Sequence, residues 1–362
     1  MFLLDKLSSP VPGTIAMRPG EELDVQRIRN WLIQQDGKQS YAHLQIYQFP
    51  SGASNLTYLL QNDDWFAVLR RPPFGPLPPK AHDMVREFEF LHALHPHFPL
   101  APQPYWLEHS GEVLGVPFYV MEFRKGVTID RKFPVDWPTH EEIGQQLSKS
   151  LVDALVDLHS IDASDESLAH FGHPQGFLER QVKGWIERYE RAKTDDYSDA
   201  STLMDWLSHS LPASESFTMI HNDYKLNNLL VSYNDGLIRV TGIVDWEMAT
   251  IGDPLLDLAV ALSYWVDADD PIEMQQWLPT VTTQKGFFSR QQLIEAYAKK
   301  SGRNVANLPY YQIFAYFKLA VILQQIYARY KKGATRDERF RSFGAAVAFL
   351  IQHAAHLAKQ AG

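Results

Sequence analysis

The sequence contains no cysteine among its 362 residues. This absence excludes disulfides, thiolate metal sites and cysteine nucleophiles, and it is compatible with a reducing compartment. No apolar run approaches the roughly 20 residues that a membrane-spanning helix requires. Charge at Asp5 also interrupts the first apolar stretch too early for a signal peptide. We therefore expect a cytoplasmic protein with no membrane partner.

Basic charge is also scarce, because the net charge is −9. A protein that binds nucleic-acid backbones without sequence preference needs a basic face, so no nucleic-acid partner is expected. The content of 45% hydrophobic and 21% charged residues is ordinary for a globular protein with a sizeable core. A chain of this length favours two lobes over one.

Apolar periodicity divides the chain into a β-rich first third and a helical remainder. Strands are expected at 44–49, 56–60, 65–69 and 116–123. A helix is expected at 81–94, with Met84, Phe88 and Leu91 on one side. Later helices are expected at 143–158, 177–191, 202–211, 310–330 and 341–359. The prediction is a bilobal α+β fold with an antiparallel sheet in an N-terminal lobe, 1–122, and a larger helical lobe, 123–362.

The most informative segment runs from 220 to 229 and is followed by an apolar run that ends at Asp245. It places Asp223 five residues before Asn228. A phosphoryl-transfer site needs a carboxylate that orients a hydroxyl, and it needs hard oxygen ligands that hold magnesium. A hairpin turn at 234–236 would return Asp245 to the end of the sheet where Asp223 lies. Turn capping is the alternative for each residue alone, but the three together favour catalysis.

Three patterns resemble the aminoglycoside phosphotransferase/choline kinase family, which has a protein-kinase-like fold. They are His221-x-Asp223-x4-Asn228, the segment 243–247, and Asp253-Pro254-x2-Asp257 after a glycine. Segments 51–58, 68–73 and 324–330 look closest to the branch of kinase-like domains fused to, or encoded beside, acyl-CoA dehydrogenases. The resemblance covers about 49–333 and implies a phosphotransferase that uses ATP or GTP with magnesium. It leaves the oligomeric state open.

The resemblance also implies roles for the matching residues. Asp223 would be the catalytic base, and Asn228 and Asp245 the magnesium ligands. His221 would brace the loop, and Asp257 would tie that loop down from the start of a buried helix. The acceptor would be the hydroxyl of a small molecule, and a functional link to an acyl-CoA dehydrogenase is implied.

The nucleotide-binding segments depart from those of protein kinases. Gly52 stands alone, without a glycine-rich repeat. Ser54 and Asn55 are therefore expected to cover the nucleotide phosphates, and a plain hairpin turn is the alternative. Met121 and Phe123 lie in the expected hinge, where they would contact the adenine.

The phosphate-binding cation is also unusual, because the third strand carries no lysine. Arg70 at its end is expected to contact the phosphates and to pair with Glu87. Arg71 is the competitor, since strand alternation directs only one of the two into the cleft. A guanidinium binds two phosphate oxygens as a fork, which makes the exchange chemically sensible.

Several other groups have a functional and a plainer interpretation. An acidic loop would attract a cationic substrate or form a solvated turn. Two aromatic residues would line the acceptor pocket or pack a helix. Three histidines would bind a metal, but a proline between them prevents a shared helix. These groups are Asp267, Asp269 and Asp270; Trp185 and Tyr189; and His92, His95 and His97.

Three hypotheses for the function remain open at this point. The leading one is a kinase for a hydroxyacyl-CoA-like metabolite, which is anionic. The second is an aminoglycoside-type antibiotic kinase, whose acceptor is cationic. The third is a nucleotide-binding pseudokinase that acts as a sensor or partner protein, and the missing lysine is its main support.

Overall fold

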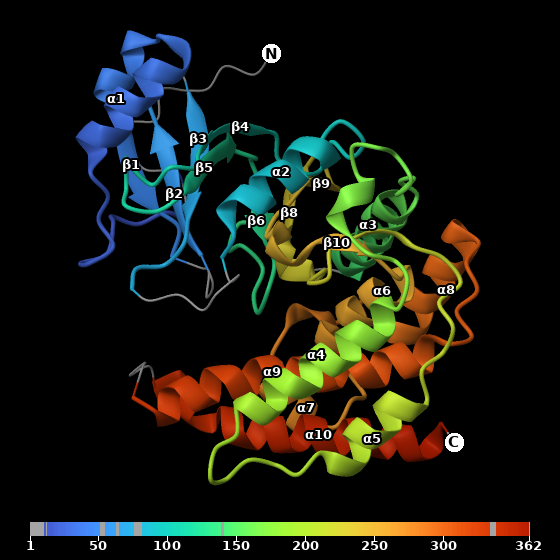
Figure 1. Cartoon of the computed structure of the whole chain (residues 1–362). Helices are drawn as coiled ribbons and strands as arrows, with labels where there is room; N and C mark the ends of the chain where they lie inside the picture. Colours follow the sequence, from blue (N-terminus) through green and yellow to red (C-terminus); the bar gives the residue numbers. More distant parts are fainter. Residues whose placement is uncertain are drawn as a thin grey trace. The chain divides into compact units, whose positions relative to one another are not determined.

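The computed structural model describes residues 11, 13–50, 55–62, 65–75, 82–138, 141–333 and 338–361. The chain divides into two compact units (Figure 1). Unit 1 comprises Met1–Lys125 and Gly242–Glu247, and unit 2 comprises Gly126–Thr241 and Met248–Gly362. Strands dominate the first and helices the second, so the predicted α+β class is confirmed.

Unit 1 is built on an antiparallel sheet of five strands in the order β1-β2-β3-β5-β4. The strands are β1 (Gln45–Gln48), β2 (Leu56–Gln61), β3 (Phe66–Arg71), β4 (Pro104–Glu108) and β5 (Phe118–Glu122). The predicted strands match the structure within two residues at each end, whereas β4 was not predicted. The sheet and helix α1 (Val25–Asp36) enclose an apolar core that includes Leu32, Tyr58 and Phe118.

Helix α2 (Met84–Leu94) places a carboxylate among buried side chains. It begins where the Asp83 carboxylate accepts the Arg86 N–H at 3.0 Å. The buried face contains Glu87 and Phe90 together with Met84, Leu91 and Leu94. The predicted side with Met84, Phe88 and Leu91 is buried at Met84 and Leu91 and half-buried at Phe88. Glu87, one position before Phe88, is also buried.

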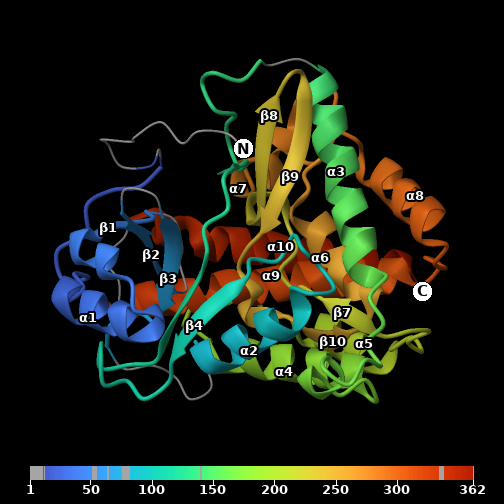
Figure 2. The same ribbon diagram turned by 90° about the horizontal axis from the view of Figure 1, so that it is seen from above.

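Unit 2 contains a hairpin of β8 (Leu229–Asn234) and β9 (Leu237–Ile243). The connecting residues Asp235 and Gly236 both have positive φ, as a two-residue type I′ turn requires. β6 (Val127–Thr128) extends this sheet, and β7 (Thr218–Ile220) pairs with β10 (Thr250–Gly252). Helix α3 (Glu141–His159) lies beside the hairpin (Figure 2), where its Gln146 Oε1 accepts the Ile238 N–H at 2.7 Å.

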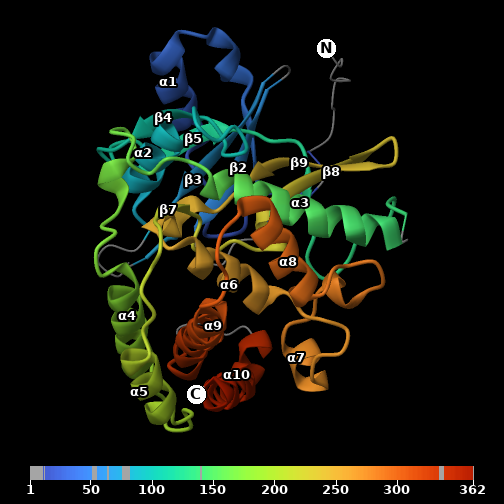
Figure 3. The ribbon, with the colours of Figure 1, turned by 90° about the vertical axis from the view of Figure 1, so that its right-hand side faces the viewer.

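The rest of unit 2 is helical. The α-helices are α4 (Phe177–Arg191), α5 (Ser201–His209), α6 (Pro254–Tyr264), α7 (Ile272–Trp277), α8 (Arg290–Ser301), α9 (Leu308–Lys331) and α10 (Phe343–Gln360). Short 3₁₀ helices in the two units lie at Gln39–His43, Ala169–Phe171, Leu226–Asn228, Trp246–Met248, Val281–Thr283 and Glu338–Ser342. Helix α6 is apolar on nearly every side and buried, and α9 packs against α4, α6 and α10 (Figure 3). In the described part of the chain, no helix is long and apolar enough to cross a membrane.

Candidate active site

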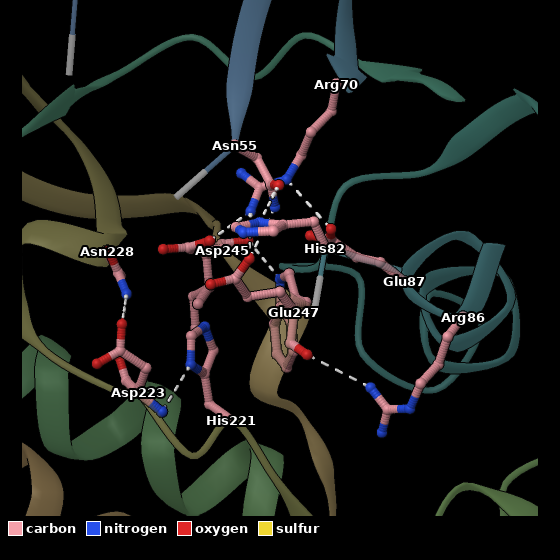
Figure 4. Close-up of polar contacts among 12 residues, drawn as sticks. Asn55, Arg70, His82, Arg86, Glu87, His221, Asp223, Asn228, Asp245 and Glu247 are labelled. Carbon is pink, nitrogen blue, oxygen red and sulfur yellow. Dashed lines mark hydrogen bonds and ion pairs between the residues drawn. The ribbon is translucent and has the colours of Figure 1, made fainter. Parts of the chain in front are cut away.

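The loop between β7 and β8 fixes Asp223 through its own side chains (Figure 4). Asn228 Nδ2 donates to the Asp223 carbonyl oxygen at 2.9 Å and to its Oδ2 at 3.3 Å. The Asp223 N–H in turn donates to His221 Nδ1 at 3.3 Å. Lys225 Nζ lies 2.7 Å from Asp223 Oδ2, and the Asp223 side chain is 15% exposed. The carboxylate therefore keeps a fixed direction while part of it faces solvent.

Asp257 anchors this loop from the first turn of α6. Its Oδ2 accepts the His221 N–H and its Oδ1 accepts the Asn222 N–H, both at 2.7 Å. His159 Nε2 lies 3.3 Å from Oδ2, and its Nδ1 lies 2.8 Å from the hydroxyl of Tyr297. Burial alone raises the pKa of Asp257, but the His159 hydrogen bond and the neighbouring histidines outweigh it and hold that pKa below its ordinary value. A buried carboxylate with three donors thus holds two consecutive peptide groups.

We expect Asp257→Asn to destabilise the protein by about 2–3 kcal/mol, because an amide cannot accept from all three donors and no longer carries charge. Chemical denaturation would measure this loss, and Asp157→Asn, an exposed residue on α3, is the matched control. A depressed carboxyl pKa contributes stability above its unfolded value of 3.8 that is lost as pH falls through the folded value. The loss of stability below pH 3.8 should therefore be shallower in Asp257→Asn than in wild type. Equal stability at pH 7 would contradict the anchor.

Arg70, at the end of β3, is surrounded by three carboxylates from two other segments of unit 1 (Figure 4). Its Nε lies 3.2 Å from Glu87 Oε2, and its NH2 group lies 2.5 Å from Asp245 Oδ1 and 3.8 Å from Glu247 Oε2. Burial alone lowers the Arg70 pKa, but the three carboxylates hold it well above its ordinary value. Burial raises the pKa of Glu87, and Asp245 and Glu247 add to this effect while Arg70 opposes it. Arg70 is therefore a buried cation that contacts three carboxylates at once.

Arg71 has a different environment from that of Arg70. Its Nε donates to the Pro72 carbonyl oxygen at 3.0 Å, and its guanidinium lies 3.8 Å from the centroid of the Phe74 ring. Consecutive strand residues point to opposite faces of the sheet, which separates the two arginines. Arg70 is thus the one that pairs with Glu87.

The predicted phosphate loop is described only in part, because Ser54 lies outside the described residues. Asn55 is buried, and its Nδ2 donates to Glu247 Oε2 at 2.7 Å. Its Oδ1 lies 2.8 Å from His82 Nδ1. Asn55 is therefore tied to the same carboxylate group that surrounds Arg70.

The two predicted hinge residues flank the end of β5. Met121 is buried within the strand and pairs with Val68 of β3. Phe123 follows the strand, and its ring centroid lies 5.8 Å from that of Phe66. Their contact with adenine stays a prediction.

Two of the three carboxylates of the acidic loop after α6 are paired with one arginine within unit 2. Arg290 NH1 donates to Asp270 Oδ2 at 2.6 Å, and its Nε lies 3.7 Å from Asp267 Oδ2. Trp185 and Tyr189 are both buried among helices, which agrees with the packing interpretation. Among the described residues, no group of three His, Cys, Asp or Glu side chains could hold a metal.

Four polar residues at these sites were not assigned a role from the sequence. Glu247 and Lys225 stand inside the motif segments, two residues after Asp245 and Asp223, so their position was a usable signal. Lys318 was detectable as a lone charge between Phe317 and Leu319 on an apolar helix. His82 offers no comparable signal. The four residues are Lys225, Glu247, Lys318 and His82.

Known proteins resemble this chain in sequence and in fold. Acyl-CoA dehydrogenase family member 11 of Mus musculus is 33% identical over 334 residues, which cover 90% of this chain and 42% of that protein. A Ralstonia eutropha protein assigned to the aminoglycoside phosphotransferases superposes with a TM-score of 0.77 at 23% identity, covering 94% of this chain and 99% of its own. Choline kinase from Cryptosporidium parvum gives a TM-score of 0.60 at 14% identity, covering 93% and 96%.

The solved structures share the kinase-like fold with this chain, which confirms the fold class. The chain spans 30–45% of the length of the acyl-CoA dehydrogenase family members 10 and 11 that it matches. The Phosphotransferase enzyme family matches residues 45–279, which contain both the Arg70 cluster and the Asp223 loop. This chain belongs to that family.

Proposed function

We propose that this chain transfers the terminal phosphoryl group of ATP or GTP to a hydroxyl group of an anionic, acyl-CoA-like metabolite. The observation that carries the proposal is the Asp223 carboxylate, which is held in a fixed direction by Lys225, Asn228 and its own loop. Membership of a phosphotransferase family supports the reaction class. The acceptor rests on charge and on the names of the relatives.

In the proposed reaction, the acceptor hydroxyl oxygen forms a bond to the terminal phosphorus while the bond to the bridging oxygen breaks. The nucleoside diphosphate leaves, and the hydroxyl proton passes to the Asp223 carboxylate. Arg70 would contact the phosphates from the N-terminal lobe, which we assign to 1–122. The lobe at 123–362 would position the acceptor, so most of the catalysis would come from positioning and charge.

The chain offers suitable ligands for magnesium. We assign the ion to Asn228 and Asp245, whose amide and carboxylate oxygens are the hard donors that it prefers. When bound, magnesium would neutralise phosphate oxygens of the nucleotide.

The charges near Asp223 favour an anionic acceptor over an aminoglycoside. Lys225 lies directly beside the proposed base, whereas Asp267 and Asp270 are occupied by Arg290. Two of the three carboxylates that the sequence suggested for a polycationic acceptor are thus already paired. The relatives are named as acyl-CoA dehydrogenases, and a link between this chain and such an enzyme is part of the proposal.

Nucleotide consumption in the presence of magnesium would test the proposal with ATP and with GTP. We expect turnover with hydroxyacyl-CoA thioesters and none with aminoglycosides. The matched control is the same acyl-CoA thioester without its hydroxyl group, which should give no turnover above the background of hydrolysis. Mass spectrometry of the product should show one added phosphoryl group.

Two results would contradict the proposal in different ways. Turnover with aminoglycosides alone would make the chain an antibiotic-type kinase. Nucleotide binding in a thermal-shift titration, without turnover on either class of acceptor, would support the pseudokinase.

A further inference from the structure

Lys318 is a charged residue inside the helical core of unit 2. It lies near the middle of α9 and is 2% exposed. Its Nζ donates to the Asn222 carbonyl oxygen at 2.5 Å and to Asn222 Oδ1 at 2.7 Å. Burying an ammonium group is costly unless it is paired and hydrogen-bonded. Both of its bonds go to the residue that immediately precedes Asp223.

Asn222 has an unusual backbone conformation. Its φ is 63°, in the left-handed region that non-glycine residues rarely adopt and that asparagine tolerates best. Its N–H donates to Asp257 at 2.7 Å, and its Nδ2 donates to the Met248 carbonyl oxygen at 3.3 Å. Asp257 thus accepts a hydrogen bond from the Asn222 N–H, while Lys318 donates hydrogen bonds to the Asn222 carbonyl and side-chain oxygens. These contacts fix the point at which the chain turns into Asp223.

The two oxygen acceptors of Lys318 Nζ favour its charged ammonium form. Burial lowers its pKa to about 8, while the nearby Asp223 and Asp257 act in the opposite direction and Lys225 and Arg188 add to the lowering. The Trp185 ring also faces the ammonium, with 5.3 Å between Nζ and the ring centroid. The two bonds to Asn222 are therefore charge-assisted, which makes them stronger than neutral ones.

We propose that Lys318 is a positioning residue, which holds Asn222 in the left-handed conformation and thereby sets the direction of the Asp223 carboxylate. This role rests on the proposed function of Asp223. Lys318 acts on the reaction through Asn222, so its loss should reduce the rate of the chemical step more than substrate binding. A displacement of about 1 Å in a reacting group can lower the rate on the order of 100-fold.

Lys318→Met tests this role, because methionine fills similar space but donates no hydrogen bond. We expect kcat to fall on the order of 100-fold, with the KM for nucleotide unchanged. Amide hydrogen exchange in peptide 219–226 should accelerate, while exchange in α6 should stay the same. The matched control is Lys331→Met on the same helix, whose ion pair with Asp196 is exposed. It should keep the wild-type kcat and exchange rates.

Two further variants keep the test decisive. Lys318→Arg retains donors and should recover part of the lost kcat. Asn222→Ala removes the Oδ1 acceptor and disfavours positive φ, so its kcat should fall as well. The kcat of the double variant Lys318→Met/Asn222→Ala should be no lower than that of the less active single variant, because both changes break the same link.

Several results would overturn the role. They are a wild-type kcat in folded Lys318→Met, a change in KM alone, or additive losses in the double variant. If Lys318→Met does not fold, an unchanged kcat in Asn222→Ala would overturn it. If the wild-type chain transfers no phosphoryl group, the proposed function fails separately. Hydrogen exchange in Lys318→Met then tests the contact between Lys318 and Asn222. Unchanged exchange in peptide 219–226 contradicts its role, and faster exchange confined to that peptide supports it.

Discussion

Asp223→Asn should lower kcat by about 10²–10⁴-fold, the usual contribution of a general base. Asparagine has the shape of aspartate and keeps one oxygen for the bonds from Lys225 and Asn228. It has no negative charge with which to orient a hydroxyl and accept its proton. The ion pair to Lys225 is partly exposed, so its loss should cost about 1 kcal/mol or less. The melting temperature should therefore shift by only about 2–4 °C.

Steady-state kinetics with the hydroxylated acceptor would measure the effect, and differential scanning fluorimetry would confirm folding. Asp153→Asn is the matched control, since Asp153 on α3 also pairs with a lysine in unit 2, and this ion pair is exposed. It should retain wild-type turnover. Turnover near the wild-type rate in Asp223→Asn would remove Asp223 from the reaction and with it the proposed mechanism.

Local signals in the sequence predicted the helices and the hairpin well. Helix α4 has the predicted bounds, because an amphipathic pattern begins directly after Gly176, whose φ is positive. The β8–β9 hairpin follows from Asp235 and Gly236, which suit its turn. The start of α6 follows from Asp253 and Pro254, since the Asp253 side chain caps the helix.

Contacts that depend on tertiary packing could not be predicted in the same way. Strand β4 begins with a proline and has a shifted register beside β5, so its pattern is weak. The burial of Glu87 could not be read from periodicity, because its apolar neighbours Phe88 and Phe90 lie on different sides of the helix. Lys318 lies 96 positions from its partner Asn222, a separation that no local pattern reports. The sequence therefore indicated the local elements better than the long-range contacts that hold the candidate residues.

Arg70→Met should have the largest effect on stability and a large effect on nucleotide use. It removes the guanidinium that contacts Glu87, Asp245 and Glu247, which leaves buried negative charge without this partner. Removing one partner of a buried ion pair typically costs about 3–5 kcal/mol. If Arg70 also contacts the phosphates, kcat/KM for the nucleotide should fall by about 10²–10³-fold, as for a lost charge-stabilising donor. Denaturant titration and kinetics would measure the two effects separately.

A second substitution separates the structural effect of Arg70 from its proposed contact with phosphate. Glu87→Gln in the Arg70→Met background removes one buried charge, so stability should partly return while kcat/KM for the nucleotide stays low. Arg71→Met is the matched control: it loses one hydrogen bond and one ring contact, worth about 1–2 kcal/mol together. Its kcat/KM for the nucleotide should not change. Full recovery of nucleotide use in the double variant would leave Arg70 a structural ion-pair residue, and a greater kinetic loss in Arg71→Met would assign the phosphate contact to Arg71 instead.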